Sequence, residues 1–503
     1  MNLTMLLDMA ADGLGDRILV GRRDDGISAR RLQELSVAGA AAIRDAGADA
    51  LVYRAVNGPA FPVALFSAAR AGVPLVPINY RLGWEQTDAL LSHHAGALVV
   101  ADDAGDGSGV FTPAAWLDLL ERTGNARADD EPESDAPAVV IYTSGTTSAP
   151  KGVLLHHHNL VSYVLGAVDF ASADEADAAL VSVPPYHIAA VANVLTNLYA
   201  GRRAVVLEQF TPAEWLDTVR EEGITNALIV PTMLARILDS GADSDVPALR
   251  SLASGGAPMP RRVVERALTV WPRVDFVNAY GLTETSSTIA VLGPDDHRAA
   301  MTSTDERVRA RLGSVGRPIP GIDLEIRDTD DRAVGAGVPG RIWVRGEQVS
   351  AEYAGVGRLV DERGFFDTRD TGFVDEDGYL FLGGRSDDTI VRGAENIAPA
   401  EIEDVIMRHP AVTDTAVVGV PDEEWGQRIE AVVVLRPERS VDAEELRSFV
   451  RETLRGSRTP DRIVYWDELP RTETGKLVRR HVVERLAADG CRTEPDGHGS
   501  LHV

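Results

Sequence analysis

Cysteine and long apolar runs are nearly absent from this sequence, and each absence narrows what the protein can be. The single cysteine among 503 residues, Cys491, lies in a polar C-terminal stretch, which excludes a disulfide framework and a cysteine metal cluster. No charge-free run approaches the roughly 18 apolar residues that a membrane-spanning helix requires. The N-terminus also lacks the basic and apolar regions of a signal peptide, so we expect a cytoplasmic protein.

Basic residues are also scarce relative to acidic ones. The chain carries 50 lysines and arginines against 77 aspartates and glutamates, a formal net charge of -27. This charge argues against nucleic acid or an anionic membrane as the main partner, and any phosphate site must be a local feature. An apolar content of 44% with 25% charged residues is typical of a soluble globular protein, and the length suggests two to four domains.

Hydrophobic patterning changes twice along the chain. Between about residues 50 and 290, helical patterns alternate with short apolar β-rich runs, among them residues 97–100, 204–207, 227–230 and 276–280. The alternation predicts α/β layers with largely parallel sheets. Residues 313–384 have the short strands and Gly/Asp turns of a β-rich subdomain. Beyond them, a helix starting at Pro399, two strand-like runs and an amphipathic helix at 442–454 predict a small α+β domain.

The loop at residues 143–152 reads Thr-Ser-Gly-Thr-Thr-Ser-Ala-Pro-Lys-Gly and follows an apolar, strand-like run at residues 138–142. Glycines allow close backbone approach, N–H and hydroxyl groups donate to phosphate oxygens, and Lys151 adds a mobile positive charge. It is not a Walker A loop, because Lys151 is preceded by Pro150 and followed by Gly152. The loop therefore suggests a polyphosphate site, with an ordinary Ser/Thr-Gly turn as the alternative.

Further motifs follow in order. Ser-Gly-Gly-Ala-Pro begins at Ser254, Asn-Ala-Tyr-Gly-Leu-Thr-Glu-Thr spans residues 278–285, Thr-Arg-Asp begins at Thr368, and Gly-Lys ends at Lys476. In the second of these, a tyrosine ring can stack on adenine and a threonine can donate to a phosphate. The glutamate can hold a Mg²⁺ that bridges phosphate oxygens.

Taken together, these motifs resemble the acyl-adenylate-forming superfamily, which includes acyl- and aryl-CoA ligases, non-ribosomal adenylation domains and beetle luciferases. The resemblance covers roughly residues 10–485. Two departures stand out: Ser148 and Arg369 each replace a glycine of the family pattern. The resemblance implies an AMP-binding domain over residues 1–386 and a small mobile catalytic domain over 387–488. We expect residues 489–503 to be a disordered tail.

The resemblance also implies roles for individual residues. It assigns catalysis to Lys476, Thr283, Glu284 and His187, with Glu284 as the metal ligand. Asp370 would accept both ribose hydroxyls, and Asp387 would be the hinge of the small domain. The implied ATP- or AMP-binding residues are Thr143, Ser144, Gly145, Thr146, Thr147, Lys151, Gly256, Ala257, Asn278, Ala279, Tyr280, Gly281, Thr283, Asp370, Arg385 and Lys476.

Two other segments correspond to the binding sites that the family has for the acid and for its acceptor. In the family, a histidine such as His187 gates the acyl pocket, and we expect Val191, Gly255 and Gly256 to line it. The residues after His187 offer no countercharge for an ammonium group, so an amino-acid substrate is disfavoured. Gly393 and Ala394 correspond to the family's CoA tunnel, where Ala394 replaces a second glycine.

The leading hypothesis is an AMP-forming ligase that converts an uncharged-tail acid, fatty or aromatic, to an acyl-adenylate and passes it to CoA. ATP, Mg²⁺ and CoA are the implied cofactors and co-substrates. An acyl-AMP ligase that loads a carrier protein and a luciferase-like oxygenase remain alternatives. A binding module without catalysis would lack Lys476 or Glu284, and both are present. The assembly state stays open, with a homodimer among the options. The histidines at 156–158 are interpreted as surface residues at a helix start rather than as a metal site.

Overall fold

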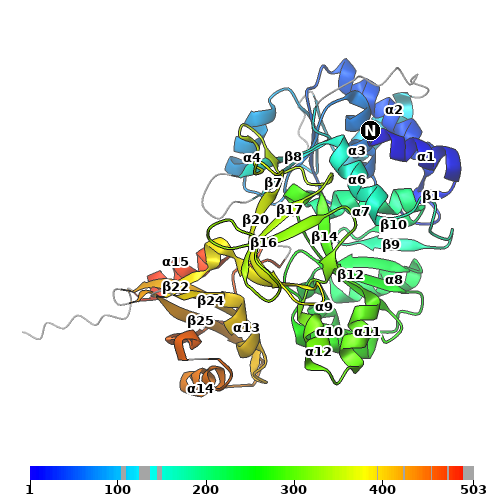
Figure 1. Cartoon of the computed structure of the whole chain (residues 1–503). Coiled ribbons are helices and arrows are strands. Elements are labelled where there is room, and N and C mark those ends of the chain that lie inside the picture. The colour runs from blue at the N-terminus through cyan, green and yellow to red at the C-terminus, as the bar shows by residue number, and fades with distance from the viewer. Residues whose placement is uncertain are drawn as a thin grey trace, which may run out of the picture. The chain divides into compact units, whose positions relative to one another are not determined.

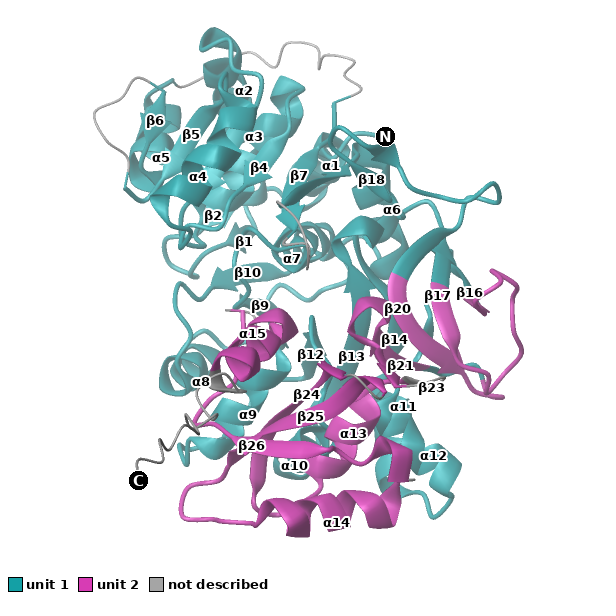
Figure 2. Cartoon of the chain, turned by 90° about the vertical axis from the view of Figure 1, so that its left-hand side faces the viewer, with its two compact units in different colours: residues 1–325, 343–368, 378–380 teal, residues 326–342, 369–377, 381–503 magenta. Residues whose placement is uncertain are grey.

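The structure of the protein is a computed structural model (Figure 1) that describes residues 1–103, 109–123, 136–143, 150–392, 395–422, 425–454, 456–472 and 475–490. The predicted fold class is confirmed: the chain is a mixed α/β protein with a large N-terminal and a small C-terminal domain. It forms two compact units, coloured separately in Figure 2. Unit 1 comprises residues 1–325, 343–368 and 378–380, and unit 2 comprises residues 326–342, 369–377 and 381–503.

A nine-stranded sheet forms the first half of unit 1. Its inner strands from β13 to β1 are parallel, and the strands at both edges are antiparallel. In sheet order the strands are β15 (Arg317–Pro318), β14 (Ser287–Leu292), β13 (Asp275–Leu282), β12 (Ser251–Gly255), β11 (Asn226–Ile229), β9 (Ala178–Val181), β10 (Arg203–Val206), β1 (Ile18–Val20) and β2 (Ile27–Ser28). The apolar runs predicted at 204–207, 227–230 and 276–280 are thus strands of one sheet.

An eight-stranded sheet forms the second half of unit 1. Its strands from β7 to β6 are parallel, and β8, β18 and β19 add antiparallel neighbours. In sheet order they are β19 (Gly357–Arg358), β18 (Glu352–Tyr353), β8 (Lys151–Leu155), β7 (Val139–Thr143), β4 (Leu75–Pro77), β3 (Leu51–Arg54), β5 (Leu98–Ala101) and β6 (Val110–Phe111). The loop predicted to bind phosphate therefore connects two antiparallel neighbours, β7 and β8.

The helices of unit 1 cover the faces of these sheets. They are α1 (Thr4–Leu14), α2 (Ala29–Asp45), α3 (Ala60–Ala71), α4 (Trp84–Leu91), α5 (Pro113–Thr123), α6 (His157–Ala167), α7 (Ile188–Ala200), α8 (Pro212–Glu221), α9 (Pro231–Asp239), α10 (Arg261–Val270), α11 (Pro294–Thr302) and α12 (Glu306–Ala310), with 3₁₀ turns η1 (Ser92–His94), η2 (Thr283–Thr285) and η3 (Arg311–Gly313). One core cluster joins α1, α2, α3 and α7 to the eight-stranded sheet, and a second joins α8, α9 and α10 to the nine-stranded sheet. Helix α8 begins as its sequence predicts. The Thr211 side chain accepts the Glu214 N–H, and Pro212 is the first helical residue.

Residues 314–385, all of them described, contain strands as their only regular elements. Four of these strands form a sheet of their own, whose residues are divided between the two units. In sheet order they are β16 (Asp323–Arg327), β17 (Gly340–Arg345), β20 (Phe366–Val374) and β21 (Leu380–Arg385). This segment corresponds to the predicted β-rich region.

The C-terminal part of unit 2 is a three-stranded sheet between helices (Figure 2). On one face, buried side chains of α13 and α14 pack against the sheet, and on the other those of α15 do so. The elements are β24 (Val412–Asp422), β25 (Gly426–Leu435), β26 (Arg462–Tyr465), α13 (Pro399–Met407), α14 (Ala443–Thr453), α15 (Arg479–Gly490), the hairpin β22 (Ile390–Arg392) and β23 (Glu395–Ile397), and the 3₁₀ turns η4 (Ser386–Asp388) and η5 (Gly456–Arg458). Across the described ranges of both units, no helix has the length and apolarity needed to cross a membrane.

Candidate active site

Glu284 lies in a sharply folded turn between β13 and β14. The pairing of these strands shifts register between Tyr280 and Gly281, as in a β-bulge. A Cβ on Gly281 would lie 1.8 Å from the carbonyl oxygen of Ser287, so no larger residue fits this backbone. The Thr285 hydroxyl bonds across the turn, accepting the Leu282 N–H at 3.0 Å. The glycine of the Tyr-Gly-Leu-Thr-Glu motif is therefore a steric requirement of the fold.

A glutamine clamps the same turn from within the protein. The Gln348 side-chain amide, which is buried, donates to the carbonyl oxygens of Thr285 at 3.0 Å and Thr288 at 2.8 Å. Hydrogen bonds to backbone carbonyls on both sides of Ser286 and Ser287 fix the course of the chain there. Sequence reasoning missed this role, because Gln348 lies 63 residues from Thr285 along the chain.

The Glu284 carboxylate has a partner on β18. The Tyr353 hydroxyl donates to Oε1 of Glu284 at 2.8 Å, and the Ala351 N–H donates to the Glu284 carbonyl oxygen at 3.1 Å. The side chains of Glu284 and Tyr353 are both half-buried. Sequence reasoning missed Tyr353 as well, and no spacing rule could have found a partner brought close only by sheet pairing.

Strands β7 and β8 flank the loop that is predicted to bind phosphate. Thr143 at the end of β7 pairs with Lys151 at the start of β8, and Lys151 is exposed. Ser144, Gly145, Thr146 and Thr147 lie outside the described residues. Strand β8 in turn pairs with β18 at Val153 and Tyr353. The Lys151 end of the loop and the Glu284 turn are therefore both connected to β18.

The Ser-Gly-Gly motif lies beside the Glu284 segment at the carboxyl ends of parallel strands. Gly255 pairs with Ala279, and a Cβ on Gly255 would lie 2.8 Å from the Ala279 carbonyl oxygen. Gly256 is exposed and has a φ of 81°, a conformation that favours glycine. Ligands of open α/β sheets bind at such carboxyl edges. The structure thus brings the two predicted nucleotide segments together.

Side chains of these two segments differ in exposure. The Ser254 hydroxyl is buried and has no hydrogen-bond partner among the described residues. The buried Asn278 amide donates to the Ser314 carbonyl oxygen at 3.2 Å. Tyr280 is only 8% exposed, which leaves little ring surface open, whereas Thr283 and Ala257 are half-buried.

The predicted acyl-binding residues lie around the start of α7. His187 directly precedes this helix, is half-buried, and has its ring 4.7 Å from that of Tyr186. Tyr186 in turn makes an edge-on contact with Tyr80 at 5.8 Å between ring centroids. Val191, one turn into α7, is fully buried and belongs to the core of unit 1. His187 therefore contacts an aromatic ring, and Val191 belongs to the apolar core.

In unit 2, Asp370 and Arg385 form an ion pair between β20 and β21. Arg385 Nε lies 3.2 Å from Asp370 Oδ1, and Asp370 is the less exposed partner. Arg369, at the position where the family has glycine, has a φ of 60°. Its carbonyl oxygen accepts the Ser386 hydroxyl at 3.0 Å. This left-handed backbone is a conformation that favours glycine over residues with a side chain.

The other unit 2 residues predicted for the site lie at the surface. Lys476 is exposed, and its backbone N–H donates to the Thr472 hydroxyl at 3.0 Å. Asp387, the predicted hinge, is exposed within η4. Gly393 and Ala394 lie outside the described residues.

The histidine run behaves only partly as predicted. His158 is exposed, but His157 packs against the N-terminal segment and accepts the Leu3 N–H on Nδ1 at 3.2 Å. Burial, reinforced by the neighbouring His156, lowers the pKa of His157 to about 4. His157 is therefore half-buried, because the segment around Leu3 packs against the start of α6.

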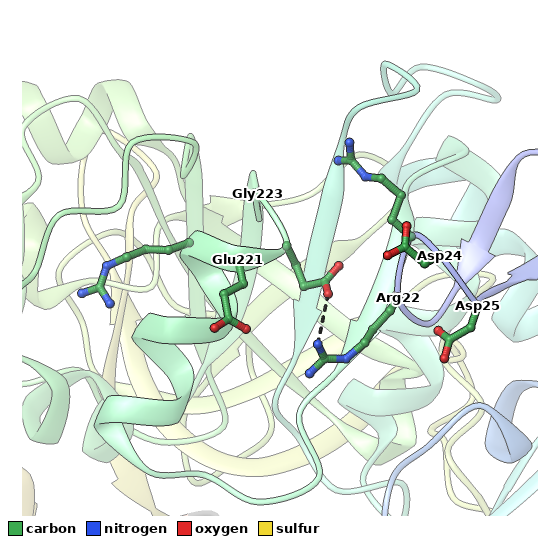
Figure 3. A pocket seen from close by; sticks show the side chains of 8 residues that line it. Arg22, Asp24, Asp25, Glu221 and Gly223 are labelled. Atoms are coloured by element: carbon green, nitrogen blue, oxygen red, sulfur yellow. Dashed lines mark ion pairs between the residues drawn. The ribbon is translucent and has the colours of Figure 1, made fainter.

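A pocket of about 470 Å³ lies elsewhere in unit 1, between the loop after β1 and the end of α8 (Figure 3). Arginines and carboxylates line it, and one pair of them forms an ion pair, Arg22 and Glu222 at 3.5 Å. Glu222 also binds Arg203, outside the lining, at 2.7 Å. Because no motif residue lines this pocket, it is not the candidate active site.

Metal binding by protein groups alone is not supported in the described ranges, where no cluster of three or more His, Cys, Asp or Glu side chains could hold an ion. A single carboxylate such as Glu284 suits Mg²⁺ only when phosphate oxygens and water complete the octahedron. The donor set therefore fits a cation that arrives with a nucleotide and does not fit a permanently bound metal.

Comparison with known proteins agrees with this geometry. Residues 7–354 match the AMP-binding enzyme family, and residues 401–476 match the AMP-binding enzyme C-terminal domain. The chain is 31% identical to a fatty acid--[acyl-carrier-protein] ligase of Streptomyces coeruleorubidus, covering 88% of each chain. It is 34% identical to a feruloyl-CoA synthase of an Amycolatopsis species, covering 87% of this chain and 89% of the relative.

A solved structure shares the whole fold. The o-succinylbenzoate CoA synthetase of Bacillus subtilis, in complex with its acyl-adenylate intermediate, superposes with a TM-score of 0.82 at 25% identity over 99% of both chains. The family matches together span most of the chain, and the curated relatives are covered nearly end to end. The chain therefore belongs to the AMP-binding enzyme family and has acyl- and aryl-CoA ligases among its relatives.

Proposed function

We propose that the protein activates a carboxylic acid with an uncharged tail, using ATP, and transfers the resulting acyl-adenylate to the thiol of CoA. The observation that carries this proposal is the Glu284 turn. A bulge, an obligatory glycine and two side-chain clamps hold a carboxylate beside the strand that leaves the phosphate loop. So much local fixation of one acidic side chain is typical of a preorganised reaction site.

The chemistry requires two anions to react. A carboxylate is a poor electrophile, and joining it to AMP provides a good leaving group for a later thiol attack. The residues must mainly align the reactants and neutralise charge as pyrophosphate leaves. We assign Thr283 and Lys151 to the phosphates, Lys476 to the carboxylate and α-phosphate, and Asp370 to the ribose. Mg²⁺, bound with ATP, would supply charge neutralisation at the phosphates, with Glu284 as its protein ligand.

For the acid, an uncharged fatty or aromatic tail is favoured. Among these described residues, the rings of Tyr80, Tyr186 and His187 and the side chains of α7 include no carboxylate that could pair with an ammonium group. The feruloyl-CoA and fatty-acid relatives support the same class of acid by their names. Gly255 and Gly256 would leave room beside the acyl group at the carboxyl end of β12.

A carrier protein is the second candidate acceptor. The relative that ligates a fatty acid to an acyl carrier protein covers as much of this chain as the CoA-forming relatives do. Both acceptors present the same phosphopantetheine thiol, so the adenylation half of the reaction is common to both proposals.

Pyrophosphate exchange tests the proposal. Purified protein with ATP, Mg²⁺ and a panel of short, medium, long and aromatic acids should exchange labelled pyrophosphate into ATP in an acid-dependent manner. CoA, or a phosphopantetheinylated carrier protein, is then added to separate reactions and the thioester is detected by mass spectrometry. Exchange with free α-amino acids as the best substrates would overturn the assigned acid class. Exchange without any acyl-CoA, but with acyl-carrier product, would replace CoA by the carrier protein.

A further inference from the structure

The Glu284 carboxylate is held by a side chain that lies 69 residues further along the sequence. The Tyr353 hydroxyl donates to Oε1 of Glu284 at 2.8 Å. For Oε2, the structure records no hydrogen bond to any described residue. One oxygen of the carboxylate is thus engaged by the protein, and the other has the capacity to bind a further group.

The backbone on both sides of this contact is fixed and strained. Ser286 and Ser287 follow Glu284 with φ values of 54° and 109°, and Ala351 precedes Tyr353 with a φ of 52°. Each is a non-glycine residue in a conformation that costs of the order of 1–3 kcal/mol, and such residues cluster at functional sites. Glycine would relieve the strain at all three positions. The chain instead keeps side chains there, and the surrounding contacts hold the conformation.

Strand β18 is tied at several points around Tyr353. The Ala351 N–H donates to the Glu284 carbonyl oxygen at 3.1 Å, and the Ala354 N–H donates to the Gly152 carbonyl oxygen at 2.8 Å. The neighbouring Glu352 Oε2 lies 3.0 Å from Nε2 of His156, at hydrogen-bonding distance. Tyr353 therefore stands between the Glu284 turn and the first residues of β8, directly after the phosphate loop.

We propose that Tyr353 is a positioning residue, which holds the Glu284 carboxylate in place for a divalent cation bound together with the ATP phosphates. The inference rests on the proposed function, since it concerns the same nucleotide. A free glutamate loses side-chain entropy when it binds an ion, and a carboxylate already fixed by an O–H donor loses less. Hydrogen-bond partners of ligating groups typically change metal affinity by about 10–100-fold.

Tyr353→Phe is the direct test, because it removes the hydroxyl and keeps the ring. With Mn²⁺ as a paramagnetic probe, titrations of the protein in the presence of ATP should show about tenfold weaker Mn²⁺ binding than in the parent. Binding of ATP in EDTA should stay unchanged, because the tyrosine acts through the cation ligand. Tyr379→Phe is the matched control, since the Tyr379 hydroxyl also donates to a carboxylate, that of Asp296, at 2.5 Å. The control should leave Mn²⁺ binding as in the parent.

A double-mutant cycle separates positioning from general destabilisation. Glu284→Gln removes the anionic ligand, so adding Tyr353→Phe to it should cause no further loss of Mn²⁺ affinity. Equal Mn²⁺ affinity of Tyr353→Phe and the parent overturns the inference, as does a full additional loss in the Glu284→Gln background. If the parent binds Mn²⁺ with ATP but shows no acid-dependent pyrophosphate exchange, the proposed function fails while the role of Tyr353 is still decided by the titrations.

Discussion

Two regions of the chain carry the charges that we assign to adenylation, and they are built in opposite ways. Glu284, in unit 1, is half-buried and fixed by Tyr353, by a bulge and by the clamp from Gln348. Lys476, in unit 2, has an exposed side chain on a small turn closed by the Thr472 N–H, which donates to the Lys476 carbonyl oxygen at 2.7 Å. The backbone of the lysine is held locally, and its side chain is exposed.

This difference indicates that Glu284 and Lys476 have different roles in the reaction. A carboxylate that must meet a cation and phosphates in every cycle benefits from fixation, because little reorganisation is then needed when charge develops. A lysine with an exposed side chain loses up to about 2 kcal/mol of rotamer entropy each time it is ordered. That cost is acceptable for a group needed in only one of two half-reactions. The predictions below test whether the fixed and the exposed charge differ in this manner.

Replacing the exposed charge should have the largest effect. Lys476→Ala should reduce acid-dependent pyrophosphate exchange by roughly 10²–10³-fold, because it removes one group that stabilises charge in the transition state. Turnover of a supplied acyl-AMP with the thiol should be largely preserved. The two half-reactions are measured separately by exchange and by thioester formation.

A surface arginine provides the control for this charge. Arg480→Ala removes a neighbouring positive charge on α15, where Arg480 pairs only loosely with Glu484 at 3.4 Å. It should leave both half-reactions near parental rates. Equal losses in the two half-reactions of Lys476→Ala would show that the lysine is not specific to adenylation.

Disturbing the fixed region should reduce stability as well as activity. Gly281→Ala places a Cβ 1.8 Å from the Ser287 carbonyl oxygen, so the turn must move. We expect a loss of about 2–3 kcal/mol in the free energy of unfolding, together with weaker Mn²⁺ binding in the presence of ATP. Gly313→Ala is the control, because a Cβ there meets nothing within 4 Å. Parental stability of Gly281→Ala, measured by urea unfolding, would contradict the tight turn.

These two regions also show what sequence patterns can and cannot predict. Strands β7 and β13 and the start of α8 follow from local signals, namely apolar β-rich runs and a Thr-Pro helix start. Such signals depend on neighbouring residues alone, and the structure has a strand or a helix start at each of these places. The motif roles came from resemblance to a family, and the bulge at Tyr280 and Gly281 gives the motif glycine a physical reason.

The partners of Glu284 were not predictable in this way. Tyr353 and Gln348 reach the turn only because β18 pairs with β8 and the preceding segment folds over β14. Pairing between distant strands leaves no periodic trace at the residues that finally touch. The same holds for His157, whose partner is the Leu3 N–H at the start of the chain.

A smaller effect on stability is expected from the protonation of His157, at the start of α6. The folded pKa of His157 is about 4, below the 6.5 of an unfolded histidine, so the unfolded chain binds more protons between these values. Stability should therefore be unaffected above pH 6.5 and fall as the pH decreases toward 4. We expect a contribution of about 1–2 kcal/mol after allowing for partial solvent exposure. Protonation would also remove the Nδ1 acceptor used by Leu3.

The variant His157→Asn isolates the contribution of His157 protonation to the free energy of unfolding. An asparagine oxygen can accept the Leu3 N–H in place of Nδ1 but does not titrate. The variant should match the parent at pH 7.5 and be more stable than the parent at pH 5, as measured by thermal unfolding at both values. Identical pH slopes for the two proteins would mean that His157 is not protected from protonation.

The smallest expected effect asks whether unit 2 stores strain beside Asp370, as unit 1 does beside Glu284. Arg369 has a φ of 60°, which costs an L-residue roughly 1–2 kcal/mol, whereas glycine adopts it freely but loses about 0.5–1 kcal/mol more entropy on folding. Comparing Arg369→Ala with Arg369→Gly removes the side chain in both cases. The glycine variant should be more stable by about 0.5–1 kcal/mol in urea unfolding.

Glu438 supplies the matched position, because its φ is 61° and it lies on an exposed turn of unit 2. The step from alanine to glycine at 438 should give the same gain in stability, since the backbone conformation is the same. Only the glycine at 369 should alter ATP binding, because Arg369 directly precedes Asp370, which we assign to the ribose and which pairs with Arg385 at 3.2 Å. Equal ATP affinity of the alanine and glycine variants at 369 would mean that backbone strain there does not influence the nucleotide. If the glycine variant at 369 is less stable than the alanine variant, the left-handed backbone of Arg369 does not store strain beside Asp370.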